Sequence, residues 1–337
     1  MTAAPRTAWQ SVAWPGHVLA AADLTCVALD ALLELASDLR RHADAYDGAL
    51  AGETLACLHA PPTAGATLPA AVAAQRLGMV SVVLPWEDLQ LGDGEPIGDA
   101  ARALASGAAA LLTHAFVHRT LKEIAAGAAV PVINGLSDQH RPCQALADLI
   151  TLSERFGGLA GMRLAFLGDG CTAIAHSLME AGALAGMEVR IACPPADRPD
   201  LLIEFGARVM AELHGGRVTV TEDPDDAVAG AHAVYTTAWV PPGHEAEHDA
   251  RVERLRPYRV LPRLMKLADP EAVFMHCLPA HRGEEVSAQV IDGPRSVVEE
   301  QAANRVRAEE ALIYALVKEG RPSARGGEKR LRADGRS

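Results

Sequence analysis

Short runs of apolar residues alternate along the chain with longer segments in which apolar residues recur every three or four positions. The short runs predict buried strands, and the helical spacing predicts helices that cover a sheet. In the first part of the chain the predicted elements are a helix at Leu24–Leu39 and strands at Thr54–His59, Ser81–Leu84, Leu111–His114 and Val130–Asn134. This alternation is typical of parallel sheets flanked by helices, so we predict an α/β protein.

A second set of elements begins near Met162. Its predicted members are strands at Arg163–Leu167, Glu188–Cys193, Val218–Thr221, Ala233–Thr236 and Val273–His276, and helices at Ala173–Leu184 and Asp200–Leu213. Between the two sets, Pro142–Phe156 is predicted as a linking helix, because proline is tolerated in the first helical turn. Glu300–Lys318 is amphipathic and predicts a final helix. The sequence thus predicts two α/β domains joined by one helix.

Length and composition exclude several classes of function. The 337 residues, at about 150 residues per domain, agree with two domains. A content of 49% hydrophobic and 22% charged residues is that of an ordinary globular protein. The formal net charge of −12 provides no basic surface for nucleic acid or an anionic membrane. We therefore expect small-molecule substrates, with no nucleic-acid or membrane partner.

The cysteines indicate the compartment. All six are scattered without a CxxC pair or zinc-type spacing, so we expect reduced thiols in a cytoplasmic protein and no metal. No apolar stretch approaches the roughly 18 residues of a membrane span. The segment 321–337 is rich in Gly and Arg and is predicted to be a disordered tail, with contact to a polyanion as the alternative.

Two segments that follow predicted strands carry candidate chemistry. Gly168-Asp169-Gly170 opens a helix, where backbone N–H groups can face a ligand, although the GxGxxG pattern is incomplete and Asp169 could equally be a helix cap. The segment His276–Val286 holds two His, a Cys, an Arg and two Glu. Such a concentration of titratable groups predicts a site. A hydrogen-bonded interdomain loop is the alternative, and the spacing favours neither a His/Cys metal site nor a Cys/His nucleophile pair.

Arginines provide the candidate anion contacts. Arg141 and Gln144 lie at the start of the linking helix, and Arg119 follows another predicted strand. Both arginines could bind an anion. The alternatives are a surface salt bridge for Arg141 and a charge at the start of a helix for Arg119.

Taken together, these segments resemble the aspartate/ornithine carbamoyltransferase family, and most closely its ornithine members. The resemblance runs from about Val18 to Lys318. Its motifs are Val130–Asp138, Pro142–Leu149, Gly168-Asp169-Gly170, Gln90-Leu91-Gly92 with Glu95, and Phe274–Val286.

The resemblance implies a fold and a chemistry. It implies a carbamoyl-phosphate-type domain at 1–145, completed by a C-terminal helix at 299–319 that crosses back, and an amino-acid-binding-type domain at 146–298. It also implies a homotrimer with active sites between subunits. Members of the family need no metal or organic cofactor, because the amine nitrogen attacks the carbamoyl carbon and the protein supplies positioning and cationic stabilisation.

The sequence departs from the family at positions that bind substrate. The family's phosphate loop, Ser-Thr-Arg-Thr-Arg, is Thr63-Ala64-Gly65-Ala66-Thr67 here, so both arginines are absent. At roughly 1.5–3 kcal/mol for each charge-assisted hydrogen bond, their loss could weaken phosphate binding by about 10² to 10⁴. The His before Pro-Cys-Gln is Arg141, the Asn after Gly-Asp-Gly is replaced by Cys171-Thr172, and the Asp expected to hold a substrate amino group is Thr237.

These comparisons define the candidate site. The predicted catalytic residues are Cys277, Arg282, Gln144 and Arg141. The predicted substrate-binding residues are Thr63, Thr67, Arg119, Asp169, Thr172, Thr237, His276, Leu278 and Arg305. We expect a divergent transferase that moves a carbamoyl-type group from carbamoyl phosphate or another anion to an amine, without ordinary ornithine activity. The alternatives are a non-catalytic trimeric paralogue with a binding role and a new reaction on the same fold.

Overall fold

Two parallel β-sheets form the frame of the molecule. The computed structural model describes residues 8–59, 64–89, 96–114, 117–241 and 243–320. The first sheet has the strand order β2-β1-β3-β4, and the second has the order β7-β6-β5-β8-β9. The strands of the first sheet are β1 (Thr54–His59), β2 (Val80–Pro85), β3 (Ala110–His114) and β4 (Val132–Leu136). Those of the second are β5 (Arg163–Leu167), β6 (Glu188–Ala192), β7 (Arg217–Thr221), β8 (Ala233–Thr236) and β9 (Val273–His276).

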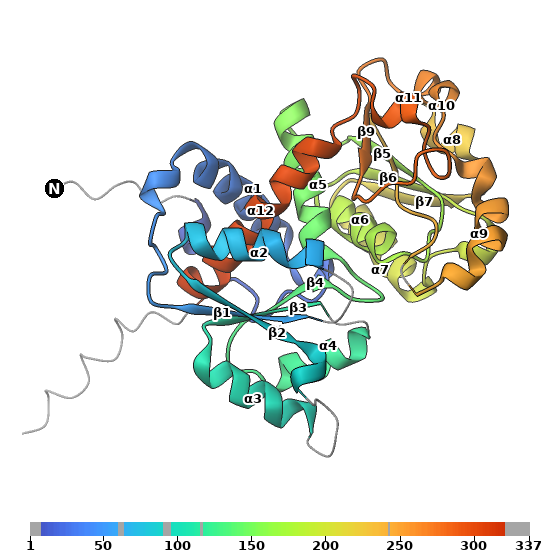
Figure 1. Ribbon diagram of the computed structural model, residues 1–337. Coiled ribbons are helices and arrows are strands. Elements are labelled where there is room, and N and C mark those ends of the chain that lie inside the picture. The colour runs from blue at the N-terminus through green and yellow to red at the C-terminus, as the bar shows by residue number, and fades with distance from the viewer. Residues whose placement is uncertain (1–7, 60–63, 90–95, 115–116, 242, 321–337) are drawn as a thin grey trace, which may run out of the picture.

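Helices flank both sheets, which confirms the predicted α/β fold (Figure 1). The helices up to the link are α1 (Cys26–Arg41), α2 (Ala64–Arg76), α3 (Ile97–Gly107), α4 (His118–Gly127) and α5 (Pro142–Phe156). The later helices are α6 (Ala173–Leu184), α7 (Leu201–Leu213), α8 (Pro224–Val228), α9 (His248–Leu255), α10 (Pro262–Leu267), α11 (Ala288–Ile291) and α12 (Val298–Tyr314), the last continued by a π-helical turn at Ala315–Glu319. None of the described helices is long and apolar enough to cross a membrane.

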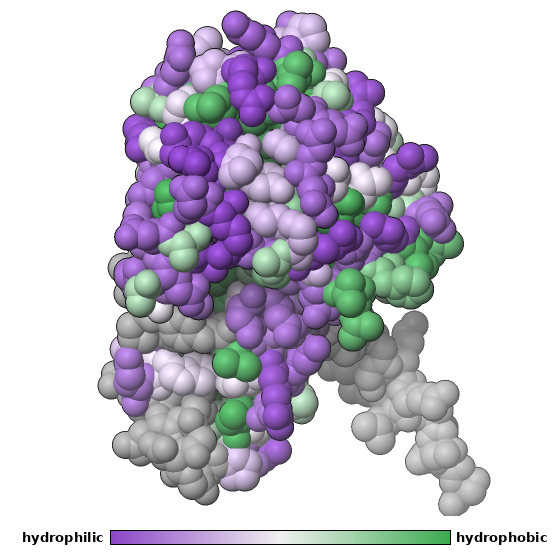
Figure 2. Space-filling view, turned by 90° about the vertical axis from the view of Figure 1, so that its right-hand side faces the viewer, coloured by the Kyte–Doolittle hydropathy of each residue, from purple (hydrophilic) through white to green (hydrophobic). Residues whose placement is uncertain are grey.

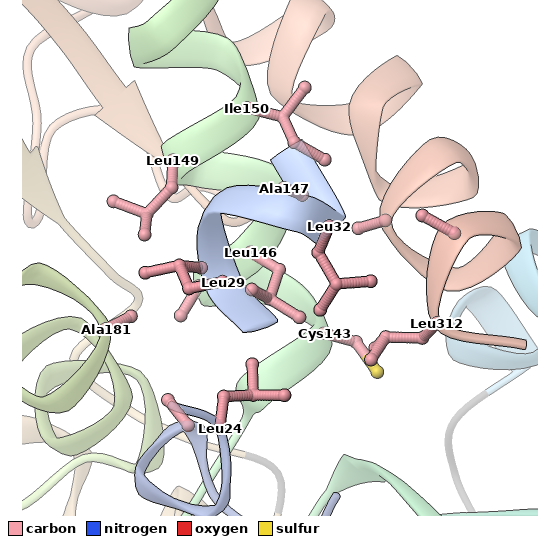
Figure 3. Packing of buried hydrophobic residues seen from close by; sticks show 14 of the residues in the cluster. Leu24, Leu29, Leu32, Cys143, Leu146, Ala147, Leu149, Ile150, Ala181 and Leu312 are labelled. Carbon is pink, nitrogen blue, oxygen red and sulfur yellow. The ribbon is translucent and has the colours of Figure 1, made fainter. Parts of the chain in front are cut away.

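The helix α5 links the two halves of the molecule. It lies between the sheets, and α12 packs along it and returns to α1 and α2 beside the first sheet (Figure 1). Figure 3 shows the resulting core, in which Leu29 and Leu32 of α1 meet Leu146 of α5 and Leu312 of α12. One apolar cluster therefore extends through both halves, and the start of α5 is held in place from several sides.

Two predictions about strands needed correction. The apolar run at Ser81–Leu84 was expected to be buried, yet β2 is an edge strand on which Val80, Val82 and Val83 are exposed. The strand predicted at Val130–Asn134 instead begins at Val132, because Pro131 has no N–H for the ladder. An apolar run alone does not show whether a strand lies at the edge or the centre of a sheet. It also does not show at which residue the strand begins.

Candidate active site

The carboxyl ends of the first sheet place two histidines side by side. His59 ends β1 and His114 ends β3, and these residues are paired in the sheet register. Their ring centroids lie 5.7 Å apart. In open α/β sheets the carboxyl edge of the strands is where ligands bind. This pair therefore marks the edge of the first sheet that faces the candidate site.

His114 is buried in a confined space. Neither of its ring nitrogens has a hydrogen-bond partner among the described residues. Burial, together with the positive charge of Arg305, His59 and Arg141, lowers the pKa of His114 to about 3, so its ring is neutral at physiological pH. A Cβ at Gly135, in β4, would lie 2.5 Å from Nε2 of His114. Glycine at position 135 therefore makes room for the ring.

Arg141 lies at the N-terminal end of α5, next to His114. Its backbone N–H donates to Oγ of Ser177 at 2.8 Å. Its side-chain Nε is buried and has no hydrogen-bond partner, and no acidic residue in the described part of the chain forms an ion pair with it. The structure thus contains no salt bridge of the kind that the sequence offered as an alternative. A half-buried arginine at a helix N-terminus, whose Nε has no hydrogen-bond partner in the described part of the chain, favours an anionic partner.

Arg305 of α12 reaches the same place from the other side. Its side chain is 6% exposed and forms an ion pair with Glu309. It donates to Oε1 of Gln144 at 3.1 Å and to the backbone carbonyl of Gly135 at 3.2 Å. The predicted residues Gln144 and Arg305 are therefore joined directly, although they are 161 positions apart.

A buried carboxylate continues this network. Oδ1 of Asp148, one turn along α5, accepts from Nε2 of Gln144 and from Nε2 of Gln301, each at 2.8 Å. Burial raises the pKa of Asp148 to about 6, against the hydrogen bonds from both glutamines and the charge of Arg141. Burial likewise raises the pKa of Glu309. The cluster thus combines two arginines with two acids that hold their protons more tightly than usual.

The second sheet contributes a threonine, a cysteine and a histidine. Thr237 follows β8 and Cys277 follows β9, and Oγ1 of Thr237 lies 3.2 Å from Sγ of Cys277 in a hydrogen bond. His276 is buried, and its Nδ1 accepts from the backbone N–H of Leu278 at 2.9 Å. The φ angle of Leu278 is +42°, which is unusual for a residue other than glycine. The predicted residues of this loop therefore lie together beside Thr237.

Asp169 and Thr172 serve the local structure. Thr172 is the N-cap of α6, and its Oγ1 accepts from the N–H of Ala175 at 3.3 Å. Asp169 forms an ion pair with Arg251, and its Oδ1 accepts from the N–H of Cys171 at 2.8 Å. Burial raises the pKa of Asp169. These contacts account for both side chains, and the helix cap is Thr172 rather than Asp169.

Two predicted residues lie apart from this group. Arg119 has a side chain that is 86% exposed and pairs with Glu123 at 3.2 Å. Arg282 pairs with Asp292 at 2.6 Å, and both of these side chains are about half exposed. Thr63 lies outside the described residues, and only the backbone of Thr67 is described, within α2.

The structure adds residues that the sequence did not single out. These are His59, His114, Asp148, Tyr235, Gln301 and Glu309. The two histidines had a signal in the sequence, since each is the last residue of a predicted strand. Burial is the main cause that raises the pKa of Tyr235. The charge of Asp148 raises it further, and the charge of Arg141 lowers it. Tyr235 therefore lies where the two halves meet.

Two parallel sheets flanked by helices, with a buried polar cluster around the start of the linking helix α5, define the class of this protein as a two-domain α/β fold. Residues 16–154 match the family model "Aspartate/ornithine carbamoyltransferase, carbamoyl-P binding domain", and residues 160–316 match "Aspartate/ornithine carbamoyltransferase, Asp/Orn binding domain". The chain belongs to the aspartate/ornithine carbamoyltransferase family, as its motifs indicated.

Proteins that are similar over most of the chain support this family assignment. The ornithine carbamoyltransferase of Methanothermobacter thermautotrophicus is 44% identical over 301 residues, which are 89% of this chain and 98% of that protein. That of Symbiobacterium thermophilum is 45% identical over 291 residues, 86% of this chain and 94% of that protein. The structure of ornithine carbamoyltransferase from Pyrococcus furiosus matches with a TM-score of 0.87 and 39% identity, covering 91% of this chain and 98% of that one.

Proposed function

We propose that this protein is a divergent carbamoyltransferase that moves a carbamoyl-type group from an anionic donor, carbamoyl phosphate or another anion, to an amine of an amino acid or related metabolite. The proposal rests above all on Arg141. Its Nε, at the N-terminus of α5, is buried and has no partner among the residues that the structure describes, and the neutral His114 lies beside it. The names of the relatives support the reaction class.

In this proposal, the anionic end of the donor accepts hydrogen bonds from the guanidinium of Arg141. Guanidinium groups bind phosphate through charge-assisted hydrogen bonds. Gln144 is fixed between Arg305 and Asp148, so its side chain is held in one orientation next to that end. The reaction is a direct attack of the amine nitrogen on the carbamoyl carbon, and the residues contribute positioning and charge stabilisation. No metal or organic cofactor takes part in it.

The acceptor differs from ornithine in this proposal. Thr237 stands where the resemblance implies an aspartate for the substrate ammonium group, and its Oγ1 is hydrogen-bonded to Sγ of Cys277 instead. We therefore expect an amine acceptor with fewer positive charges than ornithine, and slow or absent turnover of ornithine itself. Arg119 and Arg282 remain part of the site only if their segments move toward the substrate.

Assembly and location belong to the same proposal. We expect a cytoplasmic homotrimer, divided into domains at 1–145 with 299–319 and at 146–298. The return of α12 to α1 and α2 supports the division. Val80, Val82 and Val83 on the edge strand β2 are exposed apolar side chains that an intersubunit contact would cover. Light scattering coupled to size-exclusion chromatography tests the trimer directly.

The test of function uses carbamoyl phosphate labelled in its carbonyl carbon and a panel of primary amines. Label should enter an amine other than ornithine, and phosphate should raise the melting temperature. Arg141→Gln should lower the rate of labelling, and the phosphate affinity derived from the thermal shift, each by about 10- to 100-fold. The reason is that a charge-assisted hydrogen bond contributes roughly 1.5–3 kcal/mol. Arg102→Gln is the control, because Arg102 is exposed and pairs with Asp99 at 2.7 Å.

The outcomes separate the alternatives. Labelling of no amine, with no thermal shift by phosphate or carbamoyl phosphate, would contradict the proposal and favour a non-catalytic trimeric paralogue. That alternative draws on the absence of arginine from Thr63-Ala64-Gly65-Ala66-Thr67. A thermal shift without labelling would favour a new reaction on the same fold.

A further inference from the structure

A second cluster of ligand-type side chains lies in the loop between β9 and α11. His281, Glu284 and Glu285 each offer one ligand atom, and these three atoms lie within 4.8 Å of one another. The loop is held firmly, because the N–H of Gly283 donates to the carbonyl of Val286 at 2.8 Å. The three side chains thus converge from a fixed backbone.

The two carboxylates of this cluster lack a cationic partner. Among the described residues, neither Glu284 nor Glu285 forms an ion pair with arginine or lysine. Arg282, the neighbouring cation in sequence, pairs with Asp292 instead. In the described part of the chain, the ion-pair partners of these carboxylates are therefore histidines.

Glu285 carries the strongest sign of a missing ligand. Its side chain is fully buried, and Oε1 accepts from the N–H of His281 at 2.5 Å. Oε2 is buried without a hydrogen-bond partner and lies 3.9 Å from Nδ1 of His281, too far for a hydrogen bond. A buried carboxylate oxygen without a partner is costly. A cation between Oε2 and the imidazole would remove that cost.

A fourth ligand is available from α9. Nε2 of His248 lies 3.2 Å from Oε1 of Glu284. Tetrahedral zinc with ligand bonds of about 2.0–2.1 Å separates its ligand atoms by about 3.3–3.4 Å. The His248–Glu284 pair already has this spacing, and the His281–Glu285 pair needs to close by about half an ångström. His281 is half exposed, so its ring can rotate to do so.

A supporting residue lies behind the cluster. Nδ1 of the buried His276 accepts from the N–H of Leu278, so in the neutral ring Nε2 carries the proton. Nε2 is buried and lies 3.3 Å from Oε1 of Glu285, although it forms no hydrogen bond within the described residues. Such outer residues orient metal-ligating carboxylates in many proteins.

We propose that His281, Glu284 and Glu285, together with His248, bind one divalent cation of the zinc type. Two imidazoles and two carboxylates form a donor set that suits Zn²⁺. The ion joins α9 to the loop that follows Cys277. α9 lies on the side of the molecule that faces the viewer in Figure 2, where hydrophilic side chains predominate. The ion has no part in the transfer reaction, and the site stands or falls independently of the proposed function.

Metal binding to the full-length protein without an affinity tag tests this site. Equilibrium dialysis should find one Zn²⁺ bound per chain. Co²⁺ used in its place should give visible d–d absorption without a thiolate-to-cobalt charge-transfer band, because no cysteine is among the ligands. Glu284→Gln and His281→Asn should each weaken binding by about tenfold or more, since even changes to outer residues cost 10- to 100-fold.

His244→Asn is the matched control. His244 is half exposed like His281 and pairs with Glu247 at 3.3 Å, outside the cluster. It should leave the affinity unchanged, and circular dichroism should show that all three variants are folded. The proposal is overturned by an absence of bound Zn²⁺, by equal affinity in the wild type and Glu284→Gln, or by a charge-transfer band that Cys277→Ser removes.

Discussion

Replacing Asp148 by asparagine should stabilise the protein at neutral pH. Asp148 is fully buried in α5, where burial raises its pKa to about 6 from an ordinary value of 3.8. At about 1.4 kcal/mol per pKa unit, keeping this side chain ionised in the folded protein costs up to about 3 kcal/mol. An asparagine does not ionise, and its Oδ1 can still accept from Gln144 and Gln301.

The sign follows from proton binding. Well below pH 4 the carboxyl is protonated in both the folded and the unfolded chain, and it contributes no destabilisation. Between about pH 4 and pH 6 the folded protein retains a proton that the unfolded chain has lost, so stability falls as the pH rises. Above pH 6 the full cost is present. Asp148→Asn should therefore match the wild type near pH 4 and exceed it by about 1–3 kcal/mol at pH 7.

Urea unfolding of both proteins at several pH values from 4 to 7 measures this difference. Asp99→Asn is the control, because an exposed carboxylate on α3 should change stability by no more than about 0.5 kcal/mol. A destabilised Asp148→Asn at pH 7, or a difference that does not vary with pH, would refute the reasoning. Destabilisation would mean that the glutamines and Arg141 stabilise the charged form of Asp148, and a difference independent of pH would mean that burial does not raise its pKa.

Three further substitutions test the packing around the site. Gly135→Ala should cost about 1–3 kcal/mol in urea unfolding, because its Cβ would lie 2.5 Å from Nε2 of His114, whereas Gly107→Ala, with nothing within 4 Å, should not destabilise the protein. Thr172→Ala removes the cap of α6 and should lower the unfolding free energy by about 1 kcal/mol, with Thr172→Ser retaining most of it. Leu29→Ala, in the core that Figure 3 shows, should cost about 2–5 kcal/mol, and a loss below 1 kcal/mol would mean that the cavity collapses.

The sequence predicted the fold well where apolar runs are short and bounded by turn residues. The strand Arg163–Leu167 and the helices Pro142–Phe156 and Ala173–Leu184 have the predicted bounds. The helix α2 was not predicted, because it consists mostly of small apolar residues, so no polar face stands out, and Pro69 lies inside it. Helices are predicted from a contrast between an apolar and a polar face, and α2 shows little such contrast.

The site was predicted in part for a different reason. Motif order led to Arg141, Gln144 and Arg305, which the structure brings together. It gave no sign of His114, whose role depends on the neighbouring strand and on the space left by Gly135. Motif order also gave no reason to remove Arg119 and Arg282 from the candidate site, because their ion pairs with acidic residues are visible only in the structure.

The charges of the buried cluster explain how an acidic protein can still bind an anion. Arg141 and Arg305 are matched by Asp148 and Glu309, so the cluster is close to neutral when both acids are ionised. Burial raises the pKa of each acid, and Glu309 is already committed to Arg305. Asp148 is therefore the charge that opposes an incoming anion at Arg141. Because Asp148 gains its proton near pH 6, the cluster becomes more cationic there, and its hold on an anion strengthens as the pH falls toward that value.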